Sequence, residues 1–266
     1  MIKNIKLFVN NNDKSFKMAK LVKNKFLNNG FRIVDKYFDL GIALGGDGSF
    51  LGMVKSCDFS DDPYYIGINS GTLGFLQEVK DTEINKLIYE LKNDLYKVSD
   101  VGIQETKVYH CNGVSKFCSL NEIVIRNQNL KVFKGNIFIN SDLLEYFNGD
   151  GILVSTTLGS TAHNLSYGGS IVYNNFQTLQ ITPMGPINSK SYRTLSNSVI
   201  LPDKVNVFIN PMIDKNLIIT IDGENNLFDD VSSIDTSIQN KKIKCLRLSH
   251  YNFPQKINEK LLSNEK

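Results

Sequence analysis

Residues 39–52 read Asp-Leu-Gly-Ile-Ala-Leu-Gly-Gly-Asp-Gly-Ser-Phe-Leu-Gly, and the organisation of the whole chain can be worked out from this stretch. The apolar run at 40–44 predicts a short buried strand that ends at the glycine pair Gly45-Gly46. The residues after Gly48 can begin a helix. Where a strand leads through a glycine-rich turn into a helix, backbone N–H groups and the positive end of the helix dipole can bind phosphate.

Asp47 lies in the middle of this turn, where a carboxylate would repel an anion. Its presence is explained if the turn also meets a metal ion, or if a hydroxyl beside the phosphate has to lose a proton. Both explanations indicate phosphoryl transfer. The Walker pattern is absent because no Gly-Lys-Ser/Thr follows, and the dinucleotide fingerprint fails at Leu51. The competing interpretation is an ordinary turn whose glycines only supply positive φ.

Size and composition are those of an ordinary soluble protein with room for two compact domains. The chain has 266 residues, a formal net charge of +3, and no apolar stretch near the ~18 residues of a membrane span. The charge is too small and too dispersed to indicate nucleic-acid binding, and we expect no secretory signal. The four cysteines show neither a Cys-x-x-Cys pair nor a histidine at zinc-finger spacing, so we expect reduced thiols in a cytoplasmic protein.

Strands and helices alternate over residues 1–99, which predicts an α/β domain with a doubly wound, mostly parallel sheet. A second glycine turn, at 69–76, follows one of these strands. Two glycine turns at the carboxyl ends of strands fall where such sheets bind ligands. The expected strands are 2–10, 31–34, 40–44 and 64–69, and the expected helices are 13–29, 49–57 and 81–95.

Residues 100–251 are instead rich in short β segments separated by turn residues, and they predict a sandwich-like β domain. Residues 160–167 are expected to form a short helix capped by their Ser-Thr pair, and 181–187 to form a Pro/Gly-shaped loop. A last helix within 252–266, with Pro254 in its first turn, is expected to dock back on the first domain. The expected strands are 106–111, 119–126, 132–140, 152–155, 205–210, 217–222 and 243–248.

Several polar segments of the second domain are candidates for a binding site. Asn121-Glu122 sits inside an otherwise apolar strand, so at least one of these side chains should be buried or at a strand end, unless the pair marks a bulge or a sheet edge. Asp150 precedes a buried strand and, taken alone, indicates a hairpin turn. The run 155–166 is rich in hydroxyl and small side chains, which suit a polar, planar ligand better than a core. His163 alone is more simply a solvated or hydrogen-bonded residue.

Taken together, these segments resemble NAD kinases in their order and approximate spacing. The resemblance covers residues 39–223, and the Gly-Ser-Thr-Ala block at 159–162 is its most specific part. Lipid kinases of the diacylglycerol-kinase type and phosphofructokinases share a turn like the one at 45–51. The chain is similar to the compact bacterial form. The matching segments are 45–51, 69–76, Asn121-Glu122, Asp150-Gly151, 159–166 with Gly168-Gly169, and Thr182-Pro183.

The resemblance implies ATP-dependent phosphorylation of the 2′-hydroxyl of the adenosine ribose of NAD, which gives NADP. It implies that Asp47 is the catalytic residue acting on that hydroxyl, and that Asn121 and Glu122 hold the adenosine and ribose groups. The positions it assigns to the ATP phosphates are Gly45, Gly46, Gly48 and Ser49. The positions it assigns to NAD are Gly48, Phe75, Asn121, Glu122, Asn148, Asp150, Leu158, Thr161, Ala162, His163, Ser166, Gly185, Ile187 and Glu224.

The same resemblance bears on assembly and cofactors. Family members are homodimers or homotetramers, and the loop at Gly185 and Ile187 resembles one that often completes the pocket of a neighbouring subunit. ATP and NAD are the expected partners, without nucleic acid or membrane. Because both are anionic, one aspartate cannot hold the triphosphate without a cation, so Mg²⁺ or another divalent ion is expected with ATP, near Asp47. No tightly bound organic cofactor is expected.

Some positions depart from the family pattern. Ser49 replaces Thr, Leu158 stands where a hydroxyl residue is common, His163 replaces Tyr, and Asn148 stands where many members have Arg. These changes bear on affinity more than on reaction class. Two alternatives stay open. A lipid kinase acting on diacylglycerol or sphingoid bases would need an apolar substrate cleft, and a non-catalytic NAD-binding sensor would bind nucleotide without turnover.

Overall fold

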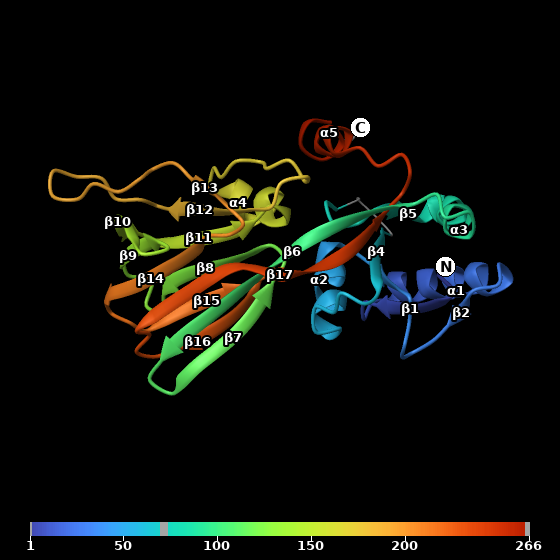
Figure 1. Ribbon diagram of the computed structural model, residues 1–266, viewed down its shortest axis with the longest axis horizontal. Helices are drawn as coiled ribbons and strands as arrows, with labels where there is room; N and C mark the ends of the chain where they lie inside the picture. Colours follow the sequence, from blue (N-terminus) through green and yellow to red (C-terminus); the bar gives the residue numbers. More distant parts are fainter. Residues whose placement is uncertain (1, 70–73, 264–266) are drawn as a thin grey trace. The chain divides into compact units, whose positions relative to one another are not determined.

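The computed structural model describes residues 2–69 and 74–263, which divide into two compact units (Figure 1). Unit 1 comprises residues 1–101 and 242–266, and unit 2 comprises residues 102–241. The chain passes between the units within two long strands, β6 (Lys97–His110) and β17 (Ser233–Arg247). The sequence placed these boundaries at 99 and 251. The second differs because β17 continues beyond residue 241 as a strand of the sheet in unit 1.

Unit 1 is an α/β layer on a parallel sheet with the strand order β17-β4-β3-β1-β2, as the alternating pattern predicts. All five residues of its central strand β3 are buried. The short strand β5 pairs with β4. The strands are β1 (Asn4–Val9), β2 (Arg32–Ile33), β3 (Leu40–Leu44), β4 (Tyr64–Asn69) and β5 (Val79–Lys80), and the helices are α1 (Asp13–Asn28), α2 (Asp47–Ser56) and α3 (Ile84–Lys92), which the 3₁₀ turn η1 (Asp81–Glu83) precedes.

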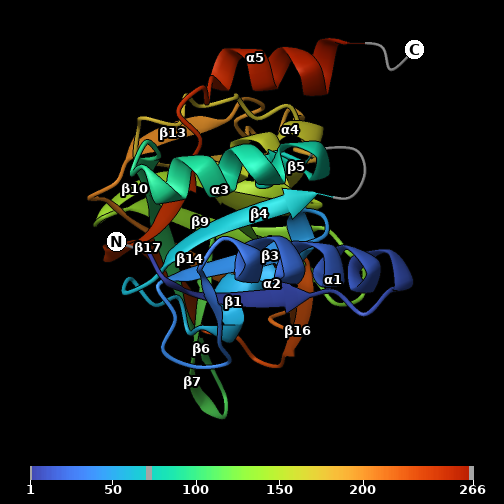
Figure 2. The same cartoon turned by 90° about the vertical axis from the view of Figure 1, so that its right-hand side faces the viewer.

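The helices cover both faces of this sheet. Figure 2 shows α1 and α3 in front of it and α2 behind. The apolar side chains of α1 and α3 form one core with the strands, whereas the buried residues of α2, Phe50, Met53 and Val54, lie outside that core. α1 begins where the Asn12 side chain accepts the N–H of Ser15 at 2.8 Å, and Gly30 follows its end with φ +86°.

Unit 2 is a β sandwich, which confirms the predicted class. One sheet is antiparallel in the order β13-β12-β11-β8-β15-β16, and the other runs β10-β9-β14-β17, with β6 beside β17 and β7 beside β6. Apolar side chains of both sheets, such as Ile152 and Ile209, share one core. The strands are β7 (Gly113–Ser119), β8 (Glu122–Asn127), β9 (Phe133–Ile139), β10 (Asp142–Gly149), β11 (Gly151–Thr156), β12 (Thr178–Met184), β13 (Val199–Pro202), β14 (Asn206–Ile213), β15 (Leu217–Ile221) and β16 (Glu224–Phe228).

Two local predictions for unit 2 are confirmed only in part. The expected loop at 181–187 begins as the end of strand β12, where Ile181 pairs with Val154. Pro183 is tolerated there because the pairing of β12 with β13 ends at Ile181, so the missing N–H breaks no ladder on that side. The segment 160–167 forms the 3₁₀ turn η2 (Leu158–Thr161) and helix α4 (His163–Ser166), but neither carries a side-chain cap. Ser160 Oγ instead accepts the N–H of Val172 at 3.1 Å.

The chain returns to unit 1 and ends in helix α5 (Phe253–Ile257), which continues into the π-helical turn η3 (Asn258–Leu262). Pro254 lies in its first turn, and the Asn252 side chain caps it by accepting the N–H of Gln255 at 3.0 Å. Phe253 and Lys256 are buried against unit 1. Within residues 2–69 and 74–263, every helix is too short or too polar to span a lipid bilayer.

Candidate active site

The glycine turn of unit 1 has one crowded side and one open side. Gly45 has φ +149°, and a Cβ there would lie 2.3 Å from Ser49 Oγ, so glycine is required. At Gly46 and Gly48, in contrast, a Cβ would meet no atom of the described residues within 4 Å. A hollow of about 320 Å³ lies beside Gly48 and Ser49. The backbone at the start of α2 is therefore open to a ligand, as a phosphate-binding turn requires.

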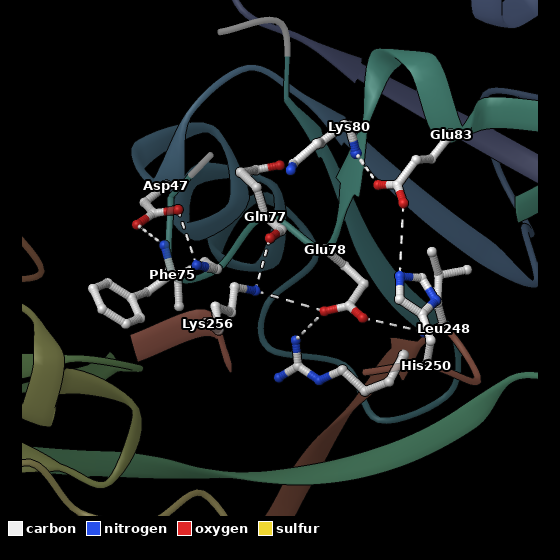
Figure 3. Close-up of polar contacts among 11 residues, drawn as sticks. Asp47, Phe75, Gln77, Glu78, Lys80, Glu83, Leu248, His250 and Lys256 are labelled. Carbon is white, nitrogen blue, oxygen red and sulfur yellow. Dashed lines mark hydrogen bonds and ion pairs between the residues drawn. The ribbon is translucent and has the colours of Figure 1, made fainter. Parts of the chain in front are cut away.

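Asp47 is the first residue of α2, and the backbone of the second glycine turn holds its carboxylate (Figure 3). The N–H groups of Phe75 and Leu76 donate to Oδ2 and Oδ1, each at 2.9 Å. A Cβ on Gly74 would lie 1.9 Å from Oδ1, so only glycine allows this approach. The two glycine turns predicted from the sequence thus meet at Asp47, although residues 70–73 of the second turn lie outside the described residues.

Gln77 supports the same turn from behind, and sequence reasoning missed it. Its Nε2 donates to the carbonyl oxygen of Gly46 at 2.7 Å, next to Asp47. The side chain is completely buried, and it lies so close to β4 that a Cβ on Gly67 would meet Gln77 Oε1 at 2.0 Å. A single buried Gln after a glycine turn carries no distinguishing signal in a sequence.

In unit 2, Asn121 and Glu122 lie at the start of β8, and only 8% and 6% of their surfaces are exposed. The prediction that at least one of these side chains is buried or at a strand end is therefore confirmed. Asp222, which sequence reasoning missed, holds the backbone at the start of β8 in place. Its carboxylate accepts the N–H groups of Leu120 and Asn121 at 2.8 Å and that of Glu122 at 3.2 Å. Among the described residues, Asn121 Oδ1 and Glu122 Oε2 are buried without a hydrogen-bond partner.

The environment of Glu122 favours its protonated form. Burial chiefly, and the negative charge of Asp222, raise the pKa of Glu122 to about 8, while a hydrogen bond from the backbone N–H of His163 opposes the rise. A carboxyl that keeps its proton near neutral pH can donate a hydrogen bond as well as accept one. Glu122 therefore suits a ligand that presents hydroxyl groups.

The hydroxyl-rich loop, within residues 155–166, packs directly on the start of β8. A Cβ on Gly159 would lie 2.1 Å from the carbonyl oxygen of Asn121, which itself accepts the N–H of Thr156 at 2.8 Å. Asn164 is fully buried and orders the loop, because its Oδ1 accepts the hydroxyl of Thr182 at 2.6 Å. The loop brings together the candidates Leu158, Thr161, Ala162, His163 and Ser166 in the consecutive turns η2 and α4. Burial, and the positive charge of Arg126, lower the pKa of His163, which favours its neutral form.

The remaining candidates of unit 2 form a second cluster. The N–H of Ile187 donates to the carbonyl oxygen of Asn148 at 2.9 Å. The N–H of Asp150 donates to the carbonyl oxygen of Met184 at 2.8 Å. Gly185 has φ +52°, and a Cβ there would lie 2.3 Å from Asp150 Oδ2.

This second cluster lies at the other end of β11 from Glu122. In the register of β11 and β8, Gly151 faces Arg126 and Ser155 faces Glu122. At ~3.3 Å per residue, these four steps correspond to ~13 Å. Glu224, exposed at the start of β16, pairs with Ile221 and lies at the same end of the sheet as Asn121.

The described residues contain no group of three or more His, Cys, Asp or Glu side chains that could hold a metal ion. The Asp47 carboxylate lies in the open glycine turn, and each of its two oxygens accepts one N–H from the described residues. Since a carboxylate offers about four acceptor positions, both oxygens keep capacity for a further contact.

Comparison with known proteins gives a consistent family. The chain matches the model of the ATP-NAD kinase N-terminal domain over residues 5–96 and that of the ATP-NAD kinase C-terminal domain over residues 120–243. NAD kinase of Finegoldia magna is 38% identical over 251 residues, which cover 91% of this chain and 92% of that protein. NAD kinase of Streptococcus gordonii is 33% identical over 243 residues, covering 91% and 88%.

Solved structures share the fold. Yeast NADH kinase complexed with NADH superposes with a TM-score of 0.84 at 22% identity, covering 100% of this chain and 89% of that one. An NAD kinase from Archaeoglobus fulgidus in complex with ATP superposes with a TM-score of 0.74 at 16% identity, covering 97% and 98%.

Proposed function

The chain belongs to the ATP-NAD kinase family, and from this premise we propose that it transfers a phosphoryl group from ATP to the 2′-hydroxyl of the adenosine ribose of NAD, with Asp47 as catalytic residue. The protein is a phosphotransferase with an alcohol acceptor, and its product is NADP. The relatives named NAD kinase and the structural neighbours with bound NADH and bound ATP support these substrates. Neither a lipid kinase nor a non-catalytic sensor finds support in these comparisons.

We infer the catalytic role of Asp47 from its position and its hydrogen bonds. Backbone N–H groups fix both carboxylate oxygens at the carboxyl end of a buried parallel strand, beside glycines that are open to a ligand. Phosphoryl transfer depends mostly on positioning and on neutralising charge. A carboxylate within hydrogen-bond reach of the ribose hydroxyl can accept its proton, which contributes roughly 10²–10⁴-fold in rate.

The phosphates of ATP are assigned to the backbone of the glycine turn, at Gly45, Gly46, Gly48 and Ser49. The residues 45–52 contain no lysine or arginine to offset their charge. A divalent cation, most simply Mg²⁺ bound to ATP, would neutralise charge on the phosphates, and the free acceptor positions of Asp47 suit such an oxygen-preferring ion. Asp47 would then be a protein ligand of this ion.

NAD binding is assigned to unit 2 and to Phe75. The unpartnered oxygens of Asn121 and Glu122 support this, because a ribose or adenine group would satisfy them. The loop residues Leu158, Thr161, Ala162, His163 and Ser166, together with Glu224, complete this group at one end of the sheet. We assign Asn148, Asp150, Gly185 and Ile187 to the pocket of a neighbouring subunit, which their separation along β11 supports.

We further propose that the protein forms a homodimer or homotetramer and that it lies in the cytoplasm. Exposed apolar side chains on β10 and β14, among them Tyr146 at 59% and Ile213 at 60% exposure, support contact between subunits. Among the described residues Cys57, Cys111, Cys118 and Cys245 form no disulfide, which supports a reducing compartment.

The decisive experiment is incubation with ATP·Mg²⁺ and NAD, with NADP detected by a coupled dehydrogenase. Asp47→Asn is expected to lose at least ~10²-fold in kcat while NAD binding, measured by calorimetry, is largely kept. Asp142→Asn, an exposed carboxylate at the start of β10, is the matched control and should behave as wild type. Full turnover by Asp47→Asn would refute the catalytic role.

A second variant tests the NAD assignment. Asn121→Ala should raise the KM for NAD, since it removes an amide whose Oδ1 is buried without a partner among the described residues. An unchanged KM would remove Asn121 from the pocket.

A further inference from the structure

A buried cluster of charges lies behind the Asp47 turn, within unit 1. Glu78 precedes β5, Arg247 ends β17, and Lys256 comes from α5. Glu78 Oε2 lies 3.4 Å from Arg247 Nη1 and 3.6 Å from Lys256 Nζ, and these three side chains are at most 7% exposed. The N–H of Leu248 donates to Glu78 Oε1 at 3.2 Å (Figure 3).

Lys256 also contacts the backbone segment 75–77, in which the N–H groups of Phe75 and Leu76 bind the Asp47 carboxylate. Its Nζ donates to the carbonyl oxygen of Gln77 at 2.8 Å. The two preceding residues, Phe75 and Leu76, bind the Asp47 carboxylate, and the Gln77 side chain binds Gly46. Through the backbone of residues 75–77 these hydrogen bonds connect the last helix to Asp47 and to Gly46. Figure 3 draws the contacts of Lys256 with Gln77 and of Phe75 with Asp47.

We propose that Lys256 is a positioning residue for phosphoryl transfer: its ammonium group fixes the segment 74–78, and this segment fixes Asp47 and the glycine turn. The inference rests on the catalytic role proposed above for Asp47. Lys256 lies beyond residues 5–96 and 120–243, which the two family models match, so the positioning contact comes from a part of the chain that they do not cover.

Charge balance favours this role over a purely structural one. Arg247 alone already balances the negative charge of Glu78. With Lys256 as well, the three side chains carry an excess of one positive charge. Burial chiefly, and the repulsion of Arg247, lower the pKa of Lys256 to about 8, while attraction to Glu78 and to Asp47 opposes the fall. Well-packed apolar residues usually stabilise a core as well as buried ion pairs do. An unbalanced buried lysine that is attracted to Asp47 is therefore better explained by the placement of that carboxylate.

The test compares Lys256→Met, which keeps the side-chain length without the charge, with Lys256→Arg, which keeps the charge and the donors. At saturating ATP·Mg²⁺ and NAD, and well below the unfolding temperature, Lys256→Met should lose about 10-fold in kcat with KM for NAD changed less than about threefold, because misplacement of a catalytic group acts on the chemical step. Lys256→Arg should restore most of the loss. Lys260→Met, on the following turn of the same segment, is the matched control and should retain wild-type kcat.

A second variant covers the case in which Lys256→Met fails to fold. Gln77→Met keeps the volume and leaves every charge in place, but it removes the bond to Gly46. It should lower kcat at least about fivefold with little change in KM for NAD. Wild-type kcat in a folded Lys256→Met, or in Gln77→Met, would overturn the inference. If Asp47→Asn stays active, the assignment of the catalytic residue fails instead, whatever the Lys256 variants do.

Discussion

Replacing Gly74 by alanine is the sharpest test of the Asp47 geometry, because the added methyl meets the carboxylate itself. A Cβ on Gly74 would lie 1.9 Å from Oδ1, 2.3 Å from Cγ and 2.6 Å from Oδ2 of Asp47, whereas real Cβ contacts essentially never fall below 3.0 Å. The carboxylate and the segment 74–76 therefore have to separate by about 1 Å. Such a shift weakens the two N–H···O bonds, each worth ~1.5–3 kcal/mol to a charged acceptor.

A displacement of about 1 Å at a catalytic group can cost about 10²-fold in rate, which corresponds to ~2.7 kcal/mol of transition-state stabilisation. We therefore expect Gly74→Ala to lower kcat about 100-fold in the coupled dehydrogenase assay while the KM for NAD changes little. The unfolding temperature should fall moderately. Wild-type kcat in a folded Gly74→Ala protein would show that the position of Asp47 does not limit the reaction.

Gly41→Ala separates lost stability from lost activity. Its Cβ would meet Met53 Sδ and a ring carbon of Phe38 at 3.2 Å, which crowds the core around β3 without touching Asp47. This variant should unfold at a lower temperature than wild type, yet its kcat below that temperature should stay within about twofold of wild type. A loss of activity equal to that of Gly74→Ala would assign the effect to general destabilisation.

Three further outcomes are expected. Gly159→Ala places a methyl 2.1 Å from the carbonyl oxygen of Asn121, so it should raise the KM for NAD about tenfold with a smaller effect on kcat, and unchanged steady-state kinetics would contradict that contact. Because the pKa of Glu122 is raised from 4.5 to about 8 in the folded state, the unfolded chain binds fewer protons between these values, and stability should fall as pH rises from 4.5 to about 8. Urea unfolding should show a smaller fall for Glu122→Gln, whereas an identical pH profile would count against the shift. Chelation of divalent ions by EDTA should stop NADP formation without changing the unfolding temperature of the nucleotide-free protein, and added Mg²⁺ should restore it; turnover that persists in EDTA would argue against the metal.

The elements that sequence predicts well are those whose signal is local. The buried strand β3, its glycine turn and the helix after it follow from consecutive residues, and Tyr64–Asn69 is a strand with the expected bounds. The strand β12 was missed because Pro183 and Gly185 indicate a loop when the pairing partners are unknown. The strand β10 lacks a clean alternation of apolar and polar residues, since its burial runs from exposed at Asp142 to buried at Gly149.

The parts of the site that sequence cannot predict depend on contacts between distant residues. Asp222 binds the N–H of Asn121 across 101 residues, and Lys256 binds the carbonyl of Gln77 across 179. Neither contact leaves a periodic or local pattern. Likewise, the distance between Asp150 and Glu122 follows from the register of β11 on β8, which only the folded sheet defines.

Unit 1 is assembled from the two ends of the chain, residues 1–101 and 242–266. Since ribosomes synthesise proteins from the amino terminus, β17 completes its sheet only after all of unit 2 has emerged, and α5 follows last. A nascent or truncated chain that stops before Lys256 would contain Asp47 and its glycine turn. It would lack the hydrogen bond from Lys256 to Gln77, which supports the segment that binds the Asp47 carboxylate. Kinase activity should therefore appear late in synthesis, once nearly the whole polypeptide has been made.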